Sequence, residues 1–453
     1  MKKSIFVILT VCVTVVCTFS CRKNAENGFE PKPVVHPDWT RTAVIYEVNL
    51  RQYTKEGTFK AFEQYLPQLK DLGVDVLWFM PVHPISELNR KGTLGSYYAV
   101  KDYKSVNPEF GTDTDFKNLI NNAHQLGFKV IIDWVANHTG CDNLWLEAHK
   151  DWYVLDSVGN PTSPYDWTDT YKLDYDNGAM RAEMTNAMKY WVQEFDIDGF
   201  RCDVAGEVPT TFWDSARFAL DSVKPVFMLA EAEKPELLKN AFDAGYNWKL
   251  LHLMNKVASA KDTTTVNDLR AYLATKDTLM PTDAYQMNFI TNHDENSWNG
   301  TEYERLQKGV QTFAVLTYTL PGIPLIYTGQ ETGLKKRLKF FDKDIVGSWT
   351  KNSAFTFYKK LNELKHTHPA LKAGEQGGEL KFFRHGYEKD LLVFMRSKEG
   401  KDLFVMLNLG NRSLEFFTND VLPRGEFTDF FTGKKLAGIP NHLNPWEYRI
   451  LIR

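Results

Sequence analysis

Cysteine is scarce in this sequence, with 5 among 453 residues. Cys12 and Cys17 lie in an N-terminal segment that is interpreted below as removable, which leaves Cys21, Cys141 and Cys202. If Cys21 carries a lipid, at most one disulfide can form, so the protein is not built on a disulfide scaffold. Its stability must come from a hydrophobic core, and a chain of this length is able to build one.

An excess of charge of one sign is also missing. The 54 basic side chains nearly balance the 57 acidic ones, and the net charge is -3. No positive field is available to hold nucleic acid or an anionic membrane surface, so nucleic acid is not an expected partner. With 43% hydrophobic and 25% charged residues, the composition indicates a folded globular protein and excludes a disordered chain or a polytopic membrane protein.

A long uncharged run begins the chain. Lys2 and Lys3 precede Ile5 to Phe19, a stretch without a charged residue. This is the pattern of a signal peptide over residues 1–20, and it is too short for a comfortable membrane span. The sequence therefore predicts export.

The end of this run contains a cysteine. Ser20 before Cys21 resembles the lipobox of bacterial lipoproteins, although Phe19 stands where a small residue is more usual. We expect Cys21 to carry a lipid and to anchor the protein to a bacterial membrane, at the periplasmic or the cell-surface face. The alternative is cleavage near Ser20 and release of a free protein. Residues 21–38, with three prolines among polar residues, are expected to form an extended tether.

Neither an internal repeat nor a low-complexity tract occurs, and from Trp39 onward apolar runs alternate with helical patterns. Strand, helix and strand at this spacing indicate parallel strands joined by right-handed crossovers. Up to eight such units fit before about residue 370, which predicts an α/β protein with a closed (β/α)8 barrel over residues 39–372. The expected strands are Ala43–Val48, Val74–Met80, Val130–Trp134, Gly199–Val204, Val226–Ala230, Met287–Thr291 and Pro324–Tyr327; the expected helices include Phe59–Leu72, Phe116–Leu126, Met180–Phe195 and Phe212–Val223.

Two segments break the alternation. Residues 139–176 are rich in Asp, Asn, Pro, Trp and Tyr without periodicity, and they are too long for a simple connection, so we expect a small lobe beside the barrel mouth. From residue 373 the pattern changes to short alternating runs with no room for a long helix. Residues 373–453 are therefore expected to form a C-terminal antiparallel β domain.

Polar residues follow several expected strands, at the end where a barrel places its active site. Arg201 and Asp203 lie on one side of their strand by alternation, Glu231 ends the next strand, and Asp294 follows a later one. Any one of these carboxylates, taken alone, is more simply explained as a solvated side chain or a helix cap. Polar ends on several strands of one barrel instead predict a shared site.

The same segments resemble signature motifs of the alpha-amylase family, glycoside hydrolase family 13. Ser96–Gly111 is similar to the family's tyrosine motif, and Gly322–Glu331 is similar to its eighth strand. The resemblance covers nearly all of Ala43–Arg453. The four signatures correspond, in chain order, to Asp133–His138, Gly199–Asp203, Glu231 and Phe289–Asp294.

The resemblance implies a role for each of three carboxyl groups. Asp203 matches the catalytic nucleophile, Glu231 the general acid/base, and Asp294 the carboxylate that supports substrate distortion. In a retaining mechanism the first two carboxyl groups lie about 5 to 5.5 Å apart. Arg201 is expected to donate to Asp203 and keep it ionised, whereas neighbouring carboxylates are expected to raise the proton affinity of Glu231.

The resemblance also implies substrate contacts. His138 and His293 match residues that bind hydroxyls of the sugar being cleaved, and Tyr98 matches the ring that stacks on that sugar. Each residue alone would more often be a core or surface residue. Lys335, Lys336 and Arg337 form a short basic run, which is expected to be a solvated loop or, second, a loop that contacts substrate.

A structural Ca²⁺ is frequent in the family, and Asn137 with Asp174 are the nearest candidates for its oxygen ligands. Lys172 departs from the family, because many members have an acid there and a cation would repel the metal. Asn137 is equally explained by a hydrogen bond to the loop. No organic cofactor is expected.

The resemblance implies a retaining, endo-acting hydrolase of α-1,4-glucosidic bonds in starch, maltodextrins or related α-glucans. The alternatives within the family are a transglycosylase, an α-glucosidase and a neopullulanase-like enzyme. From a different class, the chain would be a catalytically silent glucan-binding lipoprotein, although the intact carboxylates argue against that.

The anchor is testable on the full-length protein. We expect it to partition into the detergent phase of a phase-separation assay, and we expect Cys21→Ala to abolish incorporation of labelled lipid. Ser4→Ala, at the start of the same segment, is the matched control and should label normally. Unchanged labelling of Cys21→Ala would contradict the assignment.

Overall fold

Eight parallel strands close into a barrel in the structure, a computed structural model that describes residues 31–259, 263–275, 280–417 and 420–453. The strand order around the barrel is β1-β10-β9-β8-β7-β6-β3-β2, and β1 closes it by pairing with both β2 and β10. This confirms the predicted fold class. The barrel strands are β1 (Ile45–Val48), β2 (Val76–Phe79), β3 (Lys129–Trp134), β6 (Gly199–Cys202), β7 (Phe227–Ala230), β8 (Ala244–Tyr246), β9 (Tyr285–Asn288) and β10 (Ile323–Tyr327).

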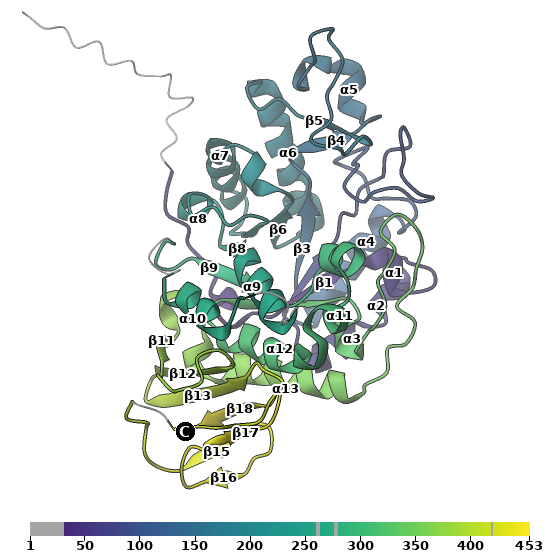
Figure 1. The fold of residues 1–453 in the computed structure, drawn as a ribbon. Helices are drawn as coiled ribbons and strands as arrows, with labels where there is room; N and C mark the ends of the chain where they lie inside the picture. Colours follow the sequence, from purple (N-terminus) through teal and green to yellow (C-terminus); the bar gives the residue numbers. More distant parts are fainter. Residues whose placement is uncertain (1–30, 260–262, 276–279, 418–419) are drawn as a thin grey trace, which may run out of the picture.

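Helices surround the barrel and bury their apolar sides against it (Figure 1). The expected helix over residues 59–72 is two helices, because the chain turns at Gln64 and Tyr65 and α3 restarts with a proline in its first turn. The helices are α1 (Leu50–Tyr53), α2 (Phe59–Glu63), α3 (Leu66–Leu72), α4 (Asp113–Gln125), α6 (Gly178–Phe195), α7 (Thr210–Asp221), α8 (Leu237–Asn240), α9 (Trp248–Ser259), α10 (Val266–Thr275), α11 (Glu302–Leu306), α12 (Val310–Thr319) and α13 (Ser353–Thr367).

Some strand boundaries differ from the sequence prediction. β8 was not predicted, because three residues with a central glycine carry no usable periodicity. β9 ends at Asn288 rather than Thr291, since its last partner on β10 is Pro324, which has no backbone N–H to continue the ladder. Phe289 and Ile290 are buried without being part of the strand, which explains why the apolar run misled the prediction.

The lobe and the C-terminal domain lie at opposite ends of the barrel (Figure 1). In the lobe, β4 (His138–Gly140) pairs antiparallel with β5 (Thr170–Lys172), and α5 (Leu144–Ala148) lies between them in the chain. Arg396 joins the C-terminal sheet to the barrel by donating to the carbonyl of Thr319, 3.2 Å away, at the end of α12. The sheet has the order β11 (Glu379–Phe382), β12 (Leu391–Lys398), β13 (Lys401–Asn408), β18 (Tyr448–Ile452), β15 (Phe427–Asp429) and β16 (Lys435–Leu436), beside a pair of β14 (Leu414–Glu415) and β17 (His442–Leu443).

The N-terminal segments fall partly outside the described residues. The predicted signal peptide, the lipid site at Cys21 and the first part of the tether all lie there. The described end of the tether contacts the barrel, because His36 Nδ1 lies 2.8 Å from Asp243 Oδ1. Within the described ranges, no helix is long and apolar enough to cross a lipid bilayer. Cys141 and Cys202 are both buried and free.

Gly199 allows β6 to approach β7 closely. A Cβ atom built there would lie 1.9 Å from the Phe227 carbonyl oxygen, which belongs to the backbone and has no room to move. β6 carries Arg201 toward the barrel mouth, and Asp203 follows it directly. The glycine therefore sets the position of the strand on which the polar site depends.

We expect Gly199→Ala to destabilise the protein by about 2 kcal/mol or more, since the added methyl group must push two paired strands apart. Gly178→Ala at the start of α6 is the matched control, because its Cβ would meet nothing within 4 Å. Thermal unfolding followed by circular dichroism measures both. Equal melting temperatures for the two variants would contradict the packing argument.

Candidate active site

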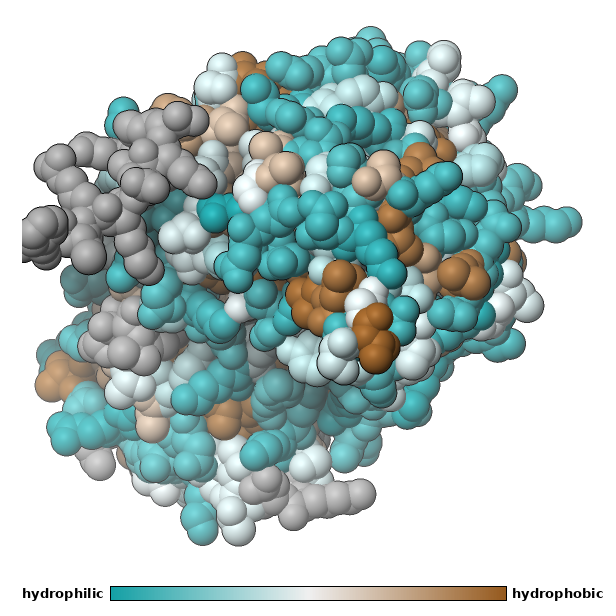
Figure 2. All heavy atoms as spheres, turned by 90° about the horizontal axis from the view of Figure 1, so that it is seen from above, coloured by the Kyte–Doolittle hydropathy of each residue, from teal (hydrophilic) through white to brown (hydrophobic). Residues whose placement is uncertain are grey.

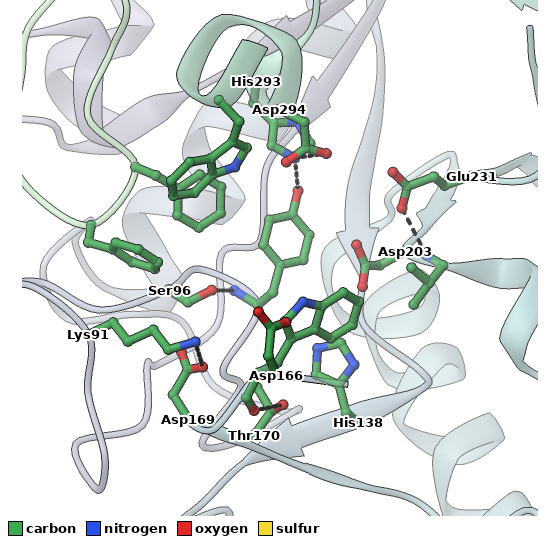
Figure 3. Close-up of a pocket in the computed structure, with 16 residues that line it drawn as sticks. Lys91, Ser96, His138, Asp166, Asp169, Thr170, Asp203, Glu231, His293 and Asp294 are labelled. Carbon is green, nitrogen blue, oxygen red and sulfur yellow. Dashed lines mark hydrogen bonds and ion pairs between the residues drawn. The ribbon is translucent and has the colours of Figure 1, made fainter. Parts of the chain in front are cut away.

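The carboxyl ends of the barrel strands surround a pocket of about 470 Å³. Asp203 directly follows β6, Glu231 follows β7, and His293 and Asp294 lie beyond β9, where the chain becomes helical. Figure 3 shows these side chains directed toward the same space, with His138 of β4 across from them. Seen from above the view of Figure 1, the surface is mainly hydrophilic, with small hydrophobic patches near its centre (Figure 2).

Arg201 holds the base of the site together. Its side chain is 0% exposed, and its Nη1 atom lies 3.0 Å from Asp203 Oδ1 and 2.8 Å from Asp133 Oδ1. Its Nη2 atom lies 2.8 Å from Glu231 Oε2. The expected contact with Asp203 is present, but the guanidinium touches Glu231 as well, so it does not single out one carboxylate.

Burial is the main influence on the two central carboxyl groups. It raises the pKa of Glu231, with Arg201 acting in the opposite direction and Asp294 adding to the rise. Burial, followed by the negative charge of Glu231, outweighs Arg201 and raises the pKa of Asp203 well above its usual range, which is against the expectation that Arg201 keeps this carboxyl group ionised. Since ionisation of one opposes ionisation of the other, the pair retains a proton at a pH where free carboxyl groups would have lost theirs.

The backbone after Asp203 positions Glu231. Val204 has φ 36°, a left-handed conformation that a β-branched residue rarely adopts. Its N–H donates to Glu231 Oε2 at 2.9 Å. A strained residue whose N–H orients a buried carboxylate is typical of a functional site, where surrounding structure compensates for local strain.

His293 links a second group of charges. Its Nδ1 atom is hydrogen-bonded to Glu47 on β1, and its Nε2 atom lies 2.8 Å from the Tyr98 hydroxyl and 3.3 Å from Asp294 Oδ2. Burial disfavours the charged imidazole, but Asp294 and Glu47 outweigh burial and raise the pKa of His293 to about 9. His293 is thus a buried cation at neutral pH and donates from both nitrogens.

Tyr98 and His138 lie on the wall of the same pocket. The Tyr98 hydroxyl donates to Asp133 Oδ2 at 3.1 Å, and its ring stacks on Phe340 with centroids 6.1 Å apart. Burial lowers the pKa of His138 to about 3, so its imidazole is neutral. The structure brings together all seven residues expected at the catalytic and substrate-binding site. Six line the pocket, and Arg201 lies beneath it in contact with Glu231: Tyr98, His138, Arg201, Asp203, Glu231, His293 and Asp294.

Each of the two expected calcium ligands, Asn137 and Asp174, has a neighbour in the protein. The Asn137 amide lies 3.3 Å from His138 Nδ1, and Asp174 Oδ1 accepts from the N–H of Asp176. Lys172, whose positive charge would repel a metal ion, lies two residues before Asp174 in the chain. Among the described residues no group of three or more His, Cys, Asp or Glu side chains is arranged to hold a metal ion.

The basic run lies away from the pocket. Lys336 forms an ion pair with Asp344, and Arg337 lies 3.0 Å from Glu304. Lys335 lies over the ring of Tyr303. None of the three lines the cleft, which favours the interpretation as a solvated loop.

Sequence reasoning missed several residues of the site. Glu47 is fully buried on β1, and Lys91 and Asp169 line the pocket from the loop after β2 and from the lobe. A carboxylate inside the apolar run Ala43–Val48 was a signal for Glu47, because an acid is buried in a core only when it has a partner. Nothing comparable marks Lys91 or Asp169, which lie in polar loops.

A parallel barrel with carboxyl groups and a buried arginine at the carboxyl ends of its strands defines the class: a (β/α)8-barrel protein with an enzyme-like site at the barrel mouth. Residues 36–172 and 164–348 match the family described as the catalytic domain of alpha amylase. The chain belongs to the alpha-amylase family of glycoside hydrolases.

Individual relatives agree with this assignment. The chain is 27% identical over 426 residues to the alpha-amylase MalA of Haloarcula japonica, covering 89% of this chain and 60% of that protein. It spans 65% of an alpha-amylase of Dictyoglomus thermophilum. The chain is thus shorter than these first curated relatives.

Solved structures extend the comparison over nearly the whole chain. A maltogenic alpha-amylase of Thermotoga neapolitana has a TM-score of 0.84 at 30% identity and covers 91% of this chain and 98% of its own. An alpha-amylase of Lactobacillus plantarum has a TM-score of 0.81 at 30% identity, with 91% and 99% covered. The barrel, the lobe and the C-terminal β domain are thus shared with alpha-amylases.

The charge on His293 generates a prediction. Its pKa is raised from 6.5 to about 9, so its stabilising contribution is complete below about pH 6.5 and is lost as the pH rises toward 9. We expect the His293 resonance, identified by its absence in His293→Gln, to titrate well above neutrality in NMR spectra of histidine-labelled protein. Glu47→Gln should lower that midpoint by a unit or more, because it removes a buried negative partner.

Glu87→Gln is the matched control, since this exposed acid pairs with Lys101 outside the pocket. It should leave the His293 midpoint in place. A wild-type midpoint at or below 6.5 would contradict the charged state.

Proposed function

We propose that this chain hydrolyses α-1,4-glucosidic bonds in starch, maltodextrins or related α-glucans with retention of anomeric configuration. The observation that carries the proposal is the joint contact of Arg201 with Asp203 and Glu231, beside Asp294, in one pocket at the barrel mouth. A retaining mechanism requires two carboxyl groups that act on opposite sides of one bond. The family assignment supports these roles.

Asp203 is the proposed nucleophile. Its side chain is 11% exposed, so its oxygens are shielded from water yet line the pocket. The Arg201 guanidinium compensates its negative charge and fixes the carboxylate for attack on the anomeric carbon. Departure of the leaving sugar leaves a glycosyl ester on Asp203, which water then hydrolyses.

Glu231 is the proposed acid and then base. Burial favours its protonated form, which is the form needed to protonate the departing oxygen. Once the ester forms on Asp203, that residue no longer carries a negative charge, and Glu231 loses its proton more readily. It is then able to take a proton from the attacking water.

His293 and Asp294 are proposed to bind hydroxyls of the same sugar. The partly exposed Asp294 carboxylate lies 3.3 Å from His293 Nε2 and offers an acceptor, and the Nε2–H, which also faces the Tyr98 hydroxyl, offers the donor. His138 is neutral and offers a donor or an acceptor from across the pocket. Tyr98 supplies an aromatic ring for stacking.

The mode of attack has two candidates. The first is the endo-acting mode expected from the sequence, in which bonds inside a long chain are cut. The second is release of short saccharides, as expected of a neopullulanase-like or maltogenic relative. The ion pair of Lys91 with Asp169 across one side of the pocket, at 3.0 Å, favours the second.

We also propose export and attachment to a bacterial membrane through lipid on Cys21. The N-terminal run and Ser20–Cys21 support this, together with the tether that leads from them to the barrel. The alternative function from another class, a catalytically silent glucan-binding lipoprotein, is distinguished from hydrolysis by one measurement. We expect release of reducing sugar from soluble starch, which a silent protein would not produce.

The separate roles of the two carboxyl groups are testable with isosteric variants. Glu231→Gln should lose activity on natural glucans by about a thousandfold or more, because their leaving group needs a proton. An activated α-glycosyl fluoride does not, so its first step should be spared and a burst should precede a slow phase. Azide should relieve the slow phase. Asp203→Asn should show no burst with either substrate.

Glu236→Gln, at the exposed start of α8, makes the same change outside the pocket and should keep full activity. Equal loss by Glu231→Gln and Asp203→Asn on both substrates, without azide rescue, would refute distinct roles. NMR of early products should show the α anomer.

A further inference from the structure

Lys91 and Asp169 form an ion pair on the pocket wall that no catalytic role uses. Lys91 Nζ lies 3.0 Å from Asp169 Oδ1, and both residues line the pocket. Lys91 comes from the loop after β2 and Asp169 from the lobe, directly before β5. The pair therefore spans two separate parts of the chain. Figure 3 shows it on the opposite side of the pocket from Glu231.

The loop that carries Lys91 is held firmly. Arg51, which is 2% exposed, donates to the carbonyls of Leu94 and Gly95 at 3.2 and 3.1 Å. Thr93 donates from its hydroxyl to Asp342 Oδ1 at 2.7 Å. These contacts tie the loop to the barrel and to the segment after β10. Lys91 thus projects from a fixed support rather than from a free loop.

The other partner is fixed as well. Asp169 is 3% exposed, and the next residue begins β5. β5 pairs with β4, where Lys172 lies opposite His138. The ion pair and a proposed sugar-binding histidine are consequently built on the same small sheet.

The direction of the substrate follows from the acid. Glu231 must reach the oxygen of the leaving group, so the leaving part of the glucan lies on the Glu231 side of the pocket. The part that becomes attached to Asp203 extends the other way. The Lys91–Asp169 pair stands on the side of the pocket away from Glu231 in Figure 3.

We propose that the Lys91–Asp169 pair closes the side of the pocket that receives the non-reducing end of the glucan. The ammonium and carboxylate bind hydroxyls of the terminal sugar and prevent a longer chain from passing. The substrate is then the end of an α-1,4-glucan, and the product is a short saccharide of one main length. This inference rests on the proposed hydrolytic function and selects its second mode.

The test compares product length on amylose and on a maltoheptaoside blocked at its non-reducing end. Wild-type protein should release mainly one short saccharide from amylose and should act poorly on the blocked substrate. Lys91→Ala should give longer, more dispersed products and cleave the blocked substrate about tenfold faster than wild type. Both should act within about twofold of each other on α-glucosyl fluoride, which occupies a single sugar site.

Two further variants separate the ion pair from general damage. Lys101→Ala removes an equivalent lysine, whose partners Glu87 and Asp142 lie outside the pocket, and should keep the wild-type products. Lys91→Arg restores a cation and should restore the single main product. A change confined to Lys91→Ala is not expected from a merely structural role, because turnover of the fluoride is preserved.

The other possible results separate failure of this inference from failure of the proposed function. Wild-type protein that cuts the blocked substrate as readily as the free one would overturn the closed end while leaving the hydrolytic function in place. So would identical products from Lys91→Ala and wild type. Absence of activity on every α-glucan and on the fluoride would overturn the proposed function, and this inference with it.

Discussion

The site depends on one buried guanidinium. Arg201 is fully enclosed and lies within 3.0 Å of oxygens of Asp133, Asp203 and Glu231, which come from three different strand ends. Without it, three carboxyl groups would face one another in a region of low polarity, where an uncompensated charge costs several kcal/mol. With it, the three carboxyl groups share one compensating positive charge. The mouth of the barrel is organised around that contact.

A single arginine does not neutralise three acids, and the remaining imbalance is chemically useful. Burial raises the pKa of both Asp203 and Glu231, so a proton is retained between them. His293 adds a second buried cation beside Glu47 and Asp294. The site therefore holds a proton on the Asp203–Glu231 pair, and the guanidinium of Arg201 contacts both carboxyl groups.

The backbone of the barrel also positions the site. Gly199 lets β6 approach β7, and Val204 adopts a strained conformation whose N–H holds Glu231. The loops are fixed in a similar way, since Arg51 binds the carbonyls of the segment that carries Lys91. The residues proposed for bond cleavage and the residues proposed to limit product length are therefore held by different parts of the structure. The first belong to the barrel and the second to loops that differ most easily between relatives.

The sequence by itself determined the barrel and the residues at its strand ends. Alternating apolar runs and helices predicted seven of the eight barrel strands, and Asp203, Glu231 and Asp294 each follow such a run. Only the tertiary structure decided that Glu47 lies against His293, 246 residues away, that Arg201 contacts both central carboxyl groups, and that Lys91 meets Asp169. These contacts depend on barrel closure and on the course of irregular loops. Neither leaves a periodic signal in the chain, because burial and pairing across a barrel arise from distant segments that meet only when the protein folds.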